Sequence, residues 1–248
     1  MNKLFLKNPH SVIAALEVRP EDVKEILLPS GRVHGAWESV AAKASEHKIL
    51  ISHVKEPDHK KSKREKKDRK HSREGASGAY IMERRPLNIE DIFPGTTQIG
   101  ENEGLWLALD CIQDPHNVGA IFRTAAFFGV KGIILPKDRT SSISDTVYDV
   151  AAGGLEYVSF AVETNLRRCL DKAREAGLWI IGTSEHAEQD LKSVDKDRSW
   201  LAVIGNEEKG IRRLILESCD EICRIDPRGR VKSLNASVAA GIIMHYFQ

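Results

Sequence analysis

Residues 105–123 read LWLALDCIQDPHNVGAIFR, an apolar run that is followed at Asn117 by a helical pattern. The same change from apolar run to helical pattern accompanies Gly205-Asn206-Glu207-Glu208-Lys209-Gly210 and Ser233-Leu234-Asn235-Ala236-Ser237-Val238-Ala239. Each of the three segments is therefore predicted to be a strand-to-helix loop. Because binding and catalytic residues tend to lie on loops held by a rigid scaffold, these segments are the first candidates for a functional site.

The half of the chain that contains these segments alternates apolar runs with helical stretches. The predicted strands are 105–111, 132–136, 157–160, 178–183, 201–204 and 221–225. The predicted helices are 117–128, 164–176, 210–218 and 234–246. This alternation predicts an α/β domain with a mostly parallel sheet and helices on both faces. Ligands in such sheets bind beyond the carboxyl ends of the strands, which is where all three segments fall.

The first 84 residues have a different pattern and are predicted to form a separate, smaller domain. Helices are expected at 11–17, 20–28 and 36–46, and a short strand at 49–51. The helix at 20–28 is favoured by a proline at its start and acidic residues in its first turn. Residues 85–103 are predicted to be a linker before a larger domain at 104–248, because they are punctuated by Pro86, Pro94, Gly95 and Gly100.

Basic charge is concentrated in one stretch of the first domain. Between His59 and Arg73 there are nine Lys and Arg residues but only two acidic ones, Glu65 and Asp68, although the whole chain has a net charge of +1. Concentrated positive charge indicates a polyanionic partner. The stretch is either a solvated surface loop or an arm that contacts phosphates, and the sequence leaves both open.

The composition is that of a globular protein without a membrane span. Of the 248 residues, 41% are hydrophobic and 29% are charged, and no run approaches the roughly 18 apolar residues of a transmembrane helix. The N-terminal apolar core is too short for a secretory signal, so a cytoplasmic location is expected. Scattered cysteines favour buried, reduced thiols over a metal site, with the last two on one helical face: Cys111, Cys169, Cys219 and Cys223.

The polar side chains of the first segment have two interpretations each. Asn is a favoured helix N-cap, so Asn117 is either a cap or a site residue. Arg123 stands among Ala, Ile, Phe and Thr, where a buried guanidinium requires an acidic partner or a bound anion. Its planar fork of donors suits an RNA phosphate, and a structural salt bridge is the alternative.

The other two segments offer close backbone approach and further polar groups. Gly205 allows the backbone to come near a ligand, and Glu207 either caps helix 210–218 or holds a substrate or a neighbouring arginine. Ser233 and Asn235 stand at the start of the last helix, where backbone N–H groups are unpaired. Capping by Ser233 is expected whatever its further role. No dinucleotide-binding Gly-x-Gly-x-x-Gly, Walker loop or Ser-His-Asp arrangement is recognisable.

Taken together, the three segments resemble the motifs of the SpoU family of RNA ribose 2′-O-methyltransferases, in the SPOUT superfamily. The matching residues are Asn117, Gly119, Arg123, Gly205, Glu207, Gly210, Ser233, Leu234, Asn235, Ser237 and Ala239. The resemblance covers nearly all of Leu105 to Gln248 and implies an α/β domain with a C-terminal trefoil knot. Residues 1–84 resemble the small L30e-like α/β domain that binds RNA substrate in the 23S rRNA guanosine methyltransferase subgroup, although the basic insertion is longer than expected there.

The resemblance also implies roles for individual residues. Backbone groups of Gly205, Ile225 and Leu234 are expected to hold S-adenosyl-L-methionine. The catalytic side is expected to comprise Arg123, Asn117, Glu207, Asn235 and Ser233, with no metal, near the subunit interface of a homodimer. One departure is Asp226, which separates Ile225 from Pro227 where the family usually has Pro directly after Ile, so this loop is expected to bend differently.

The predicted function is therefore S-adenosylmethionine-dependent 2′-O-methylation of a ribose in structured RNA, with a guanosine of 23S rRNA as the expected target. One rival is a tRNA ribose 2′-O-methyltransferase, against which the separate N-terminal domain argues. The other is a non-catalytic RNA-binding ribosome-assembly factor, against which the intact Arg123, Glu207 and Asn235 argue.

Overall fold

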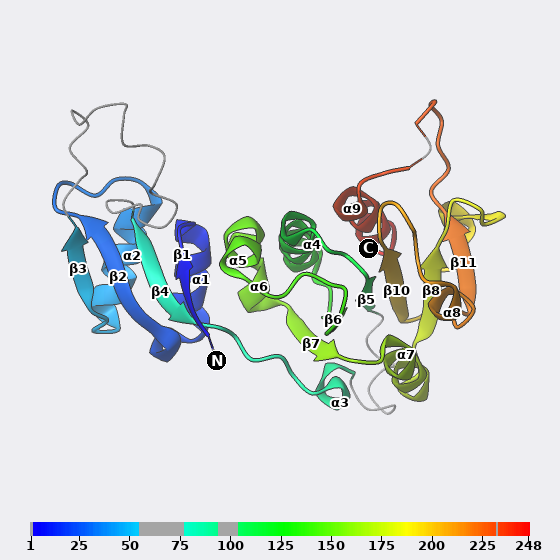
Figure 1. Ribbon diagram of the computed structural model, residues 1–248, viewed down its shortest axis with the longest axis horizontal. Helices are drawn as coiled ribbons and strands as arrows, with labels where there is room; N and C mark the ends of the chain where they lie inside the picture. Colours follow the sequence, from blue (N-terminus) through cyan, green and yellow to red (C-terminus); the bar gives the residue numbers. More distant parts are fainter. Residues whose placement is uncertain (1, 55–76, 94–103, 232) are drawn as a thin grey trace. The chain divides into compact units, whose positions relative to one another are not determined.

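A computed structural model of the protein describes residues 2–54, 77–93, 104–231 and 233–248. The chain divides into two compact units, Met1–Arg84 and Arg85–Gln248, each with its own sheet (Figure 1). The basic stretch 59–73 lies outside the described residues. Within the described ranges, no helix is both long and apolar enough to cross a membrane.

In its described residues, the first unit is a four-stranded mixed sheet with two α-helices that pack against each other. The strand order is β1-β4-β2-β3, with β4 antiparallel to β1 and β2, and β3 parallel to β2. The strands are β1 (Lys3–Leu6), β2 (Val23–Pro29), β3 (Ile51–Val54) and β4 (Gly78–Met82). The helices are α1 (Pro9–Val18), which is capped by the Asn8 side chain, and α2 (Ala36–Glu46).

The helix predicted at 20–28 is wrong. Pro20–Asp22 form one 3₁₀ turn, η1, and Val23–Pro29 form strand β2. The proline and acidic residues do begin a turn, but residues 23–28 are rich in Val, Ile and Leu, and pairing with both β3 and β4 overrides the local helical signal. Helix α1 begins two residues before its predicted start, and α2 coincides with its prediction.

The second unit is built on a seven-stranded sheet in which every neighbouring pair is parallel. The strand order is β7-β6-β5-β10-β8-β11-β9. The strands are β5 (Leu105–Asp110), β6 (Gly132–Pro136), β7 (Ser159–Glu163), β8 (Trp179–Thr183), β9 (Gln189–Asp190), β10 (Trp200–Gly205) and β11 (Glu221–Arg224). All residues of β5 and β6 are buried, as expected for central strands covered on both sides.

Helices cover both faces of this sheet (Figure 1). One face carries α3 (Ile89–Ile92), α7 (Leu166–Glu175) and α8 (Arg213–Leu216), whose apolar side chains form a buried cluster with Trp106 and Ala108 of β5. The other face carries α4 (Pro115–Phe128), α5 (Asp145–Ala151), α6 (Gly154–Tyr157) and α9 (Ala236–Tyr246). The predicted α/β fold with a parallel sheet and helices on both faces is therefore confirmed.

Several local predictions in this unit are corrected. Tyr157 ends helix α6, so the strand expected at 157–160 is β7, which starts at Ser159. The helix expected at 210–218 is only the four residues of α8, because Gly210 has a φ of +64° and closes a turn. Cys219 and Cys223 do not share a helical face, since Cys219 follows α8 and Cys223 lies in β11. All four cysteines are free thiols.

Residues 85–93, part of the stretch expected to be a linker, contribute to the core of the second unit. Leu87 forms a parallel bridge to Ala161 in β7, and Ile89 and Ile92 are buried in the same cluster as Trp106. The Trp106 indole Nε1 donates a hydrogen bond of 3.0 Å to the carbonyl of Ile92. Residues 94–103 lie outside the described part of the chain.

Candidate functional site

The first two predicted segments meet at the carboxyl edge of the seven-stranded sheet. Strand β5 ends at Asp110 and β10 ends at Gly205, and these two residues are partners in the parallel ladder. The loop after β5 leads into α4, and the loop after β10 forms the turn 205–210. The sheet therefore brings together two segments that are almost ninety residues apart in the sequence.

The turn at 205–210 is closed by its own backbone. The N–H of Asn206 donates to the carbonyl of Gly210 at 3.1 Å, and the N–H of Gly210 donates to the carbonyl of Asn206 at 2.9 Å. A Cβ atom on Gly205 would lie 2.4 Å from the Gly210 carbonyl carbon, so only glycine fits there. The Asn206 amide also donates to the carbonyl of Cys111 at 3.2 Å, which ties the turn to the loop after β5.

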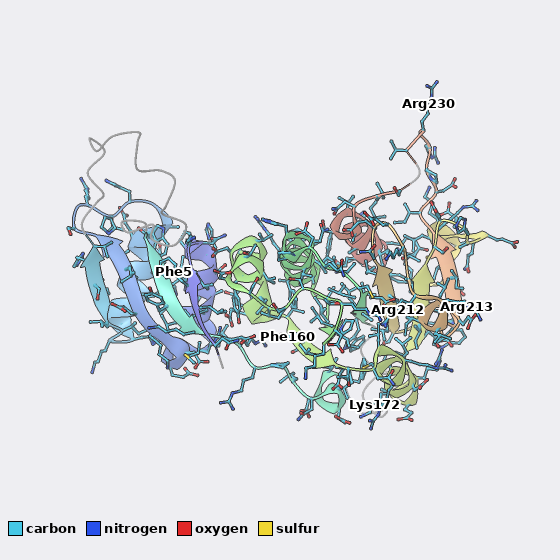
Figure 2. All side chains as sticks on the ribbon, viewed as in Figure 1. Phe5, Phe160, Lys172, Arg212, Arg213 and Arg230 are labelled. Carbon is cyan, nitrogen blue, oxygen red and sulfur yellow. The ribbon has the colours of Figure 1, made fainter. Side chains whose placement is uncertain are left out.

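A buried carboxylate joins the same two loops. Asp110 is 0% exposed, and its Oδ2 accepts a 2.8 Å hydrogen bond from the backbone N–H of Arg212. Its Oδ1 accepts from the Arg212 guanidinium, with Nε and Nη2 each at 2.7 Å. Hydrogen bonding to Asp110 raises the pKa of Arg212 above its ordinary value. Figure 2 labels Arg212 beside Arg213, at the start of α8.

Three polar side chains, one from each predicted segment, form a continuous hydrogen-bonded chain. The Asn117 side-chain amide donates to the Glu207 carboxylate, and the Asn235 amide donates to Asn117 Oδ1 at 2.9 Å. Asn235 Oδ1 in turn accepts from the backbone N–H and the hydroxyl of Ser237, at 2.9 and 2.6 Å. The three segments therefore converge on one set of side-chain contacts.

The N-caps of α4, α8 and α9 differ from those that the sequence suggests. Helix α4 is capped by Asp114, whose carboxylate accepts from the His116 N–H, so Asn117 lies in the first turn and is buried. Helix α9 is capped by Asn235, so the expected cap at Ser233 is wrong. Helix α8 has no side-chain cap, so Glu207 does not cap it. Asn117 and Glu207 are thus left for contacts between loops.

Arg123 lies on the surface, whereas the sequence suggested a buried guanidinium. Its side chain is exposed on α4, and it makes no hydrogen bond or ion pair with any of the described residues. It is six residues beyond Asn117, which in an α-helix is about 9 Å along the axis and about 120° around it. Within one chain, Arg123 therefore does not join the Asn117 contacts, and its guanidinium is available to an external anion.

The three residues expected to hold the cofactor lie at the same edge of the sheet. Gly205 ends β10, Ile225 directly follows β11, and Leu234 precedes the cap of α9. Leu234 has an exposed fraction of 44%, so an apolar side chain is open to a ligand at the N-terminus of a helix. Ser233 is exposed beside it. Figure 2 shows Arg230 near the tip of the loop that joins β11 to α9.

Sequence reasoning missed Asp110 and Arg212. An acidic residue that directly follows five apolar residues of a buried strand was the available signal, because a buried carboxylate requires a partner. Cys111, the next residue, has a φ of +63°, and its pKa is raised by burial and by the Asp110 charge. Among the described side chains, no group of three or more His, Cys, Asp or Glu could hold a metal ion.

Comparison with known proteins identifies the family. A model of the SpoU rRNA methylase family matches residues 104–245. A Pseudomonas putida protein named 23S rRNA (guanosine-2′-O-)-methyltransferase RlmB is 34% identical over 241 residues, covering 95% of this chain and 92% of the relative. A Nitrosomonas europaea protein of the same name is 36% identical over 238 residues, covering 95% and 87%.

A solved structure shares the fold. The AdoMet-bound rRNA methyltransferase of Sinorhizobium meliloti superposes with a TM-score of 0.74 at 24% identity, covering 99% of this chain and 86% of that chain. The chain belongs to the SpoU rRNA methylase family, as its three sequence segments predict.

Proposed function

We propose that this protein transfers the methyl group of S-adenosylmethionine to the ribose 2′-hydroxyl of a guanosine in 23S rRNA. The observation that carries the proposal is the hydrogen-bonded chain Glu207–Asn117–Asn235, which joins the three segments of the family pattern at one sheet edge. The relatives named 23S rRNA (guanosine-2′-O-)-methyltransferase cover nearly the whole chain, and they support the choice of RNA and nucleoside.

The residues at the sheet edge fit S-adenosylmethionine. The backbone of Gly205 and Ile225 at two strand ends, and of Leu234 before α9, can supply the main-chain donors and acceptors that suit an adenine base. The exposed Leu234 side chain adds an apolar surface, and the helix N-terminus adds unpaired N–H groups. When bound, this cofactor supplies an electrophilic methyl group.

The chain's own residues then orient and activate the ribose. Glu207 accepts a hydrogen bond from Asn117 through Oε1, and its exposed carboxylate can accept the proton of a ribose hydroxyl. Asn117 and Asn235 fix the orientation of that carboxylate. Arg123, exposed and without a partner among the described residues, binds the neighbouring phosphate and stabilises the alkoxide that develops as the hydroxyl loses its proton.

Replacing Arg123 tests these roles. The Arg123→Ala variant should lose about 10²- to 10³-fold in single-turnover methylation rate, the usual range for loss of one donor that stabilises a developing oxyanion. Binding of S-adenosylmethionine, measured by calorimetry, should be unchanged. Arg213→Ala is the matched control, because Arg213 is exposed and its only ion pair within the described part of the chain is with Glu217, on the surface near α8. Near-normal turnover by Arg123→Ala would contradict the role.

Mapping of 2′-O-methyl groups in RNA from cells with and without the gene tests the substrate. Loss of methylation at one guanosine of 23S rRNA is the expected result. A change confined to tRNA would instead favour the tRNA methyltransferase alternative. Cofactor binding without methylation of any RNA would favour a non-catalytic assembly factor.

We further infer the finer architecture that the family implies. Residues 1–84 form an L30e-like RNA-binding domain and residues 104–248 the methyltransferase domain, while residues 85–103 connect the two and contribute Ile89 and Ile92 to the core of the second. The last part of the chain forms a trefoil knot, which agrees with the return of α9 to pack against α4 and β10 after the loop at 225–235. A crystal structure whose closed backbone trace is unknotted would rule out the knot. A fragment 1–84 without a cooperative unfolding transition would argue against the separate domain.

A homodimer in the cytoplasm is also part of the proposal. Phe127 on α4 and Val238 and Ile242 on α9 are exposed, and these two helices pack against each other. Arg123 is one turn from Phe127 on the same helix, so a dimer that buries these side chains brings Arg123 to the subunit interface. Fractionation that found the protein outside the cytoplasm would contradict the location.

A further inference from the structure

The sheet of the first unit has one buried face and one partly open face. Partner residues in the ladders share a face, and Leu6, Ile26, Ala79 and Ile81, which are all fully buried, lie on one face. The opposite face carries Phe5, Glu25, Leu27, Ser52 and Tyr80, all of them partly exposed. We call these five side chains the open face. The two helices α1 and α2 pack together on one side of the strands (Figure 1).

Two aromatic rings lie next to each other on the open face. Phe5 in β1 is directly opposite Tyr80 in β4. Their ring centroids are 4.9 Å apart, and the angle between the ring planes is 49°. A Cβ atom on Gly78 would lie 2.2 Å from the Phe5 ring, so the ring rests on the backbone of β4 where no side chain intervenes. Figure 2 labels Phe5 on this sheet. Because Gly78 has no side chain, the Phe5 ring can pack directly on this part of the sheet.

A cation stands beside the rings. The Lys3 ammonium lies 4.3 Å from the centroid of the Tyr80 ring, within the range of a cation–π interaction. Lys3 is exposed, so its ammonium can also meet an anion at the edge of the aromatic pair. Proteins that bind single-stranded nucleic acids combine aromatic rings with nearby cations. The bases stack on the rings, and the phosphates contact the cations.

The distribution of charge between the two units favours the same partner. Residues 1–84 contain 18 Lys and Arg against 12 Asp and Glu, whereas residues 85–248 contain 19 against 24. Positive charge is thus in excess only in the unit that carries the open face, and a polyanion is drawn to that unit rather than to the other.

We propose that the open face binds an unpaired stretch of the RNA substrate, with one base stacked on Phe5 or Tyr80 and the adjoining phosphate at Lys3. The proposal rests on the proposed function, because it takes RNA to be the substrate. Unpaired rather than paired RNA is specified because stacking requires the face of a base, which a duplex covers with its neighbouring bases. The open face would thus select the structural context of the target, while the second unit carries out the chemistry.

Binding of short RNAs to the full-length protein tests the proposal. The probe is a fluorescein-labelled single-stranded oligoribonucleotide of about ten nucleotides, and a duplex of equal length is its comparison. Phe5→Leu and Tyr80→Leu remove a ring but keep an apolar side chain, whereas Phe5→Tyr and Tyr80→Phe keep the ring. Each leucine variant should weaken single-strand binding by about 5- to 150-fold, which is the fold-change for loss of one base–aromatic stack of ~1–3 kcal/mol. Each ring-conserving variant should bind within about twofold of the original protein.

Three further measurements keep the outcome decisive. Thermal unfolding and binding of S-adenosylmethionine should be the same in all four variants, which excludes loss of folding as the cause. An oligoribonucleotide that contains 4-thiouridine should form photo-cross-links to peptides from β1 or β4. Any of three results would overturn the proposal. They are unchanged affinity in both leucine variants, no binding of the single strand by the original protein, and cross-links found only outside the first unit. Methylation by the original protein in those cases would leave the proposed function standing.

Discussion

Asp110 is the side chain on which the local geometry of the site depends. A carboxylate that is fully removed from water is unfavourable unless it is paired and hydrogen-bonded, and Asp110 receives three donors from Arg212. The Arg212 side chain remains 42% exposed, so one end of the pair keeps its contact with water. Because this pair joins the last residue of β5 to the start of α8, it fixes the turn that carries Glu207.

The free thiols give a prediction for the effect of pH on stability. Burial raises the pKa of Cys169, Cys219 and Cys223 from 9.0 to about 12. A thiol whose folded pKa is raised contributes stability that is fully present below pH 9 and is lost as pH rises toward 12. The free energy of unfolding in urea should therefore be lower at pH 11 than at pH 8.

Other groups also titrate in this alkaline window, so a matched comparison is needed. A variant with Ala at Cys169, Cys219 and Cys223 should lose less stability than the original protein between pH 8 and pH 11, although it starts from a lower value because of its cavities. Equal losses in the two proteins would show that the thiols do not contribute to the pH dependence.

At the level of elements, the position of α4 determines where both Asn117 and Arg123 lie. Helix α6 begins at Gly154, directly against the backbone of α4. A Cβ atom at Gly154 would lie 2.6 Å from the Phe122 carbonyl oxygen and 2.8 Å from the Arg123 Cα atom. Backbone atoms cannot move aside as the end of a flexible side chain can, so this contact holds α4 and α6 at a fixed separation.

Gly154→Ala should therefore lower the free energy of unfolding by about 1–3 kcal/mol, because it overpacks the α4–α6 contact. The measurement is urea denaturation, together with single-turnover methylation to detect displacement of Arg123. Gly229→Ala is the matched control, since a Cβ atom there would meet nothing within 4 Å, and its stability should change by less than about 0.5 kcal/mol. Equal stability of both variants would contradict the close contact.

At the level of the whole molecule, exposed apolar side chains on α4 and α9 form the surface proposed for the homodimer. Phe127 is 82% exposed, which is unusual for a large apolar side chain on a helix of a folded domain. Val238 and Ile242 are four residues apart on α9, so they lie on the same side of that helix. Two copies that meet through this surface would bury Phe127 of α4 together with Val238 and Ile242 of α9.

Phe127→Glu should weaken such a dimer by roughly 30-fold or more, the change that corresponds to the ~2 kcal/mol expected for an interfacial aromatic side chain. Sedimentation equilibrium measures the dissociation constant directly. Leu214→Glu is the control, because Leu214 is also exposed but lies on α8, on the other face of the sheet. A dimer that persists equally in both variants, or an original protein that is monomeric, would contradict the proposed interface.

Much of this protein can be predicted from its sequence, because the relevant patterns are local. Buried strands such as β5 and β6 are continuous apolar runs, and their alternation with helices is enough to specify a parallel sheet. The three segments specify the family by their residue types and order, and Asn117, Glu207 and Asn235 are identifiable from that resemblance.

Other features depend on residues that only the folded chain brings together. Residues 23–28 form a strand because β3 and β4 pair with them from both sides, which no short window of sequence contains. The partner of Asp110 is 102 residues away, and Phe5 meets Tyr80 only through the β1–β4 ladder. Exposure of Arg123 likewise depends on which side of α4 faces the sheet. The family and the parallel sheet thus follow from the sequence alone, whereas the long-range pairings depend on the folded chain, because they are set by its topology and not by local preference.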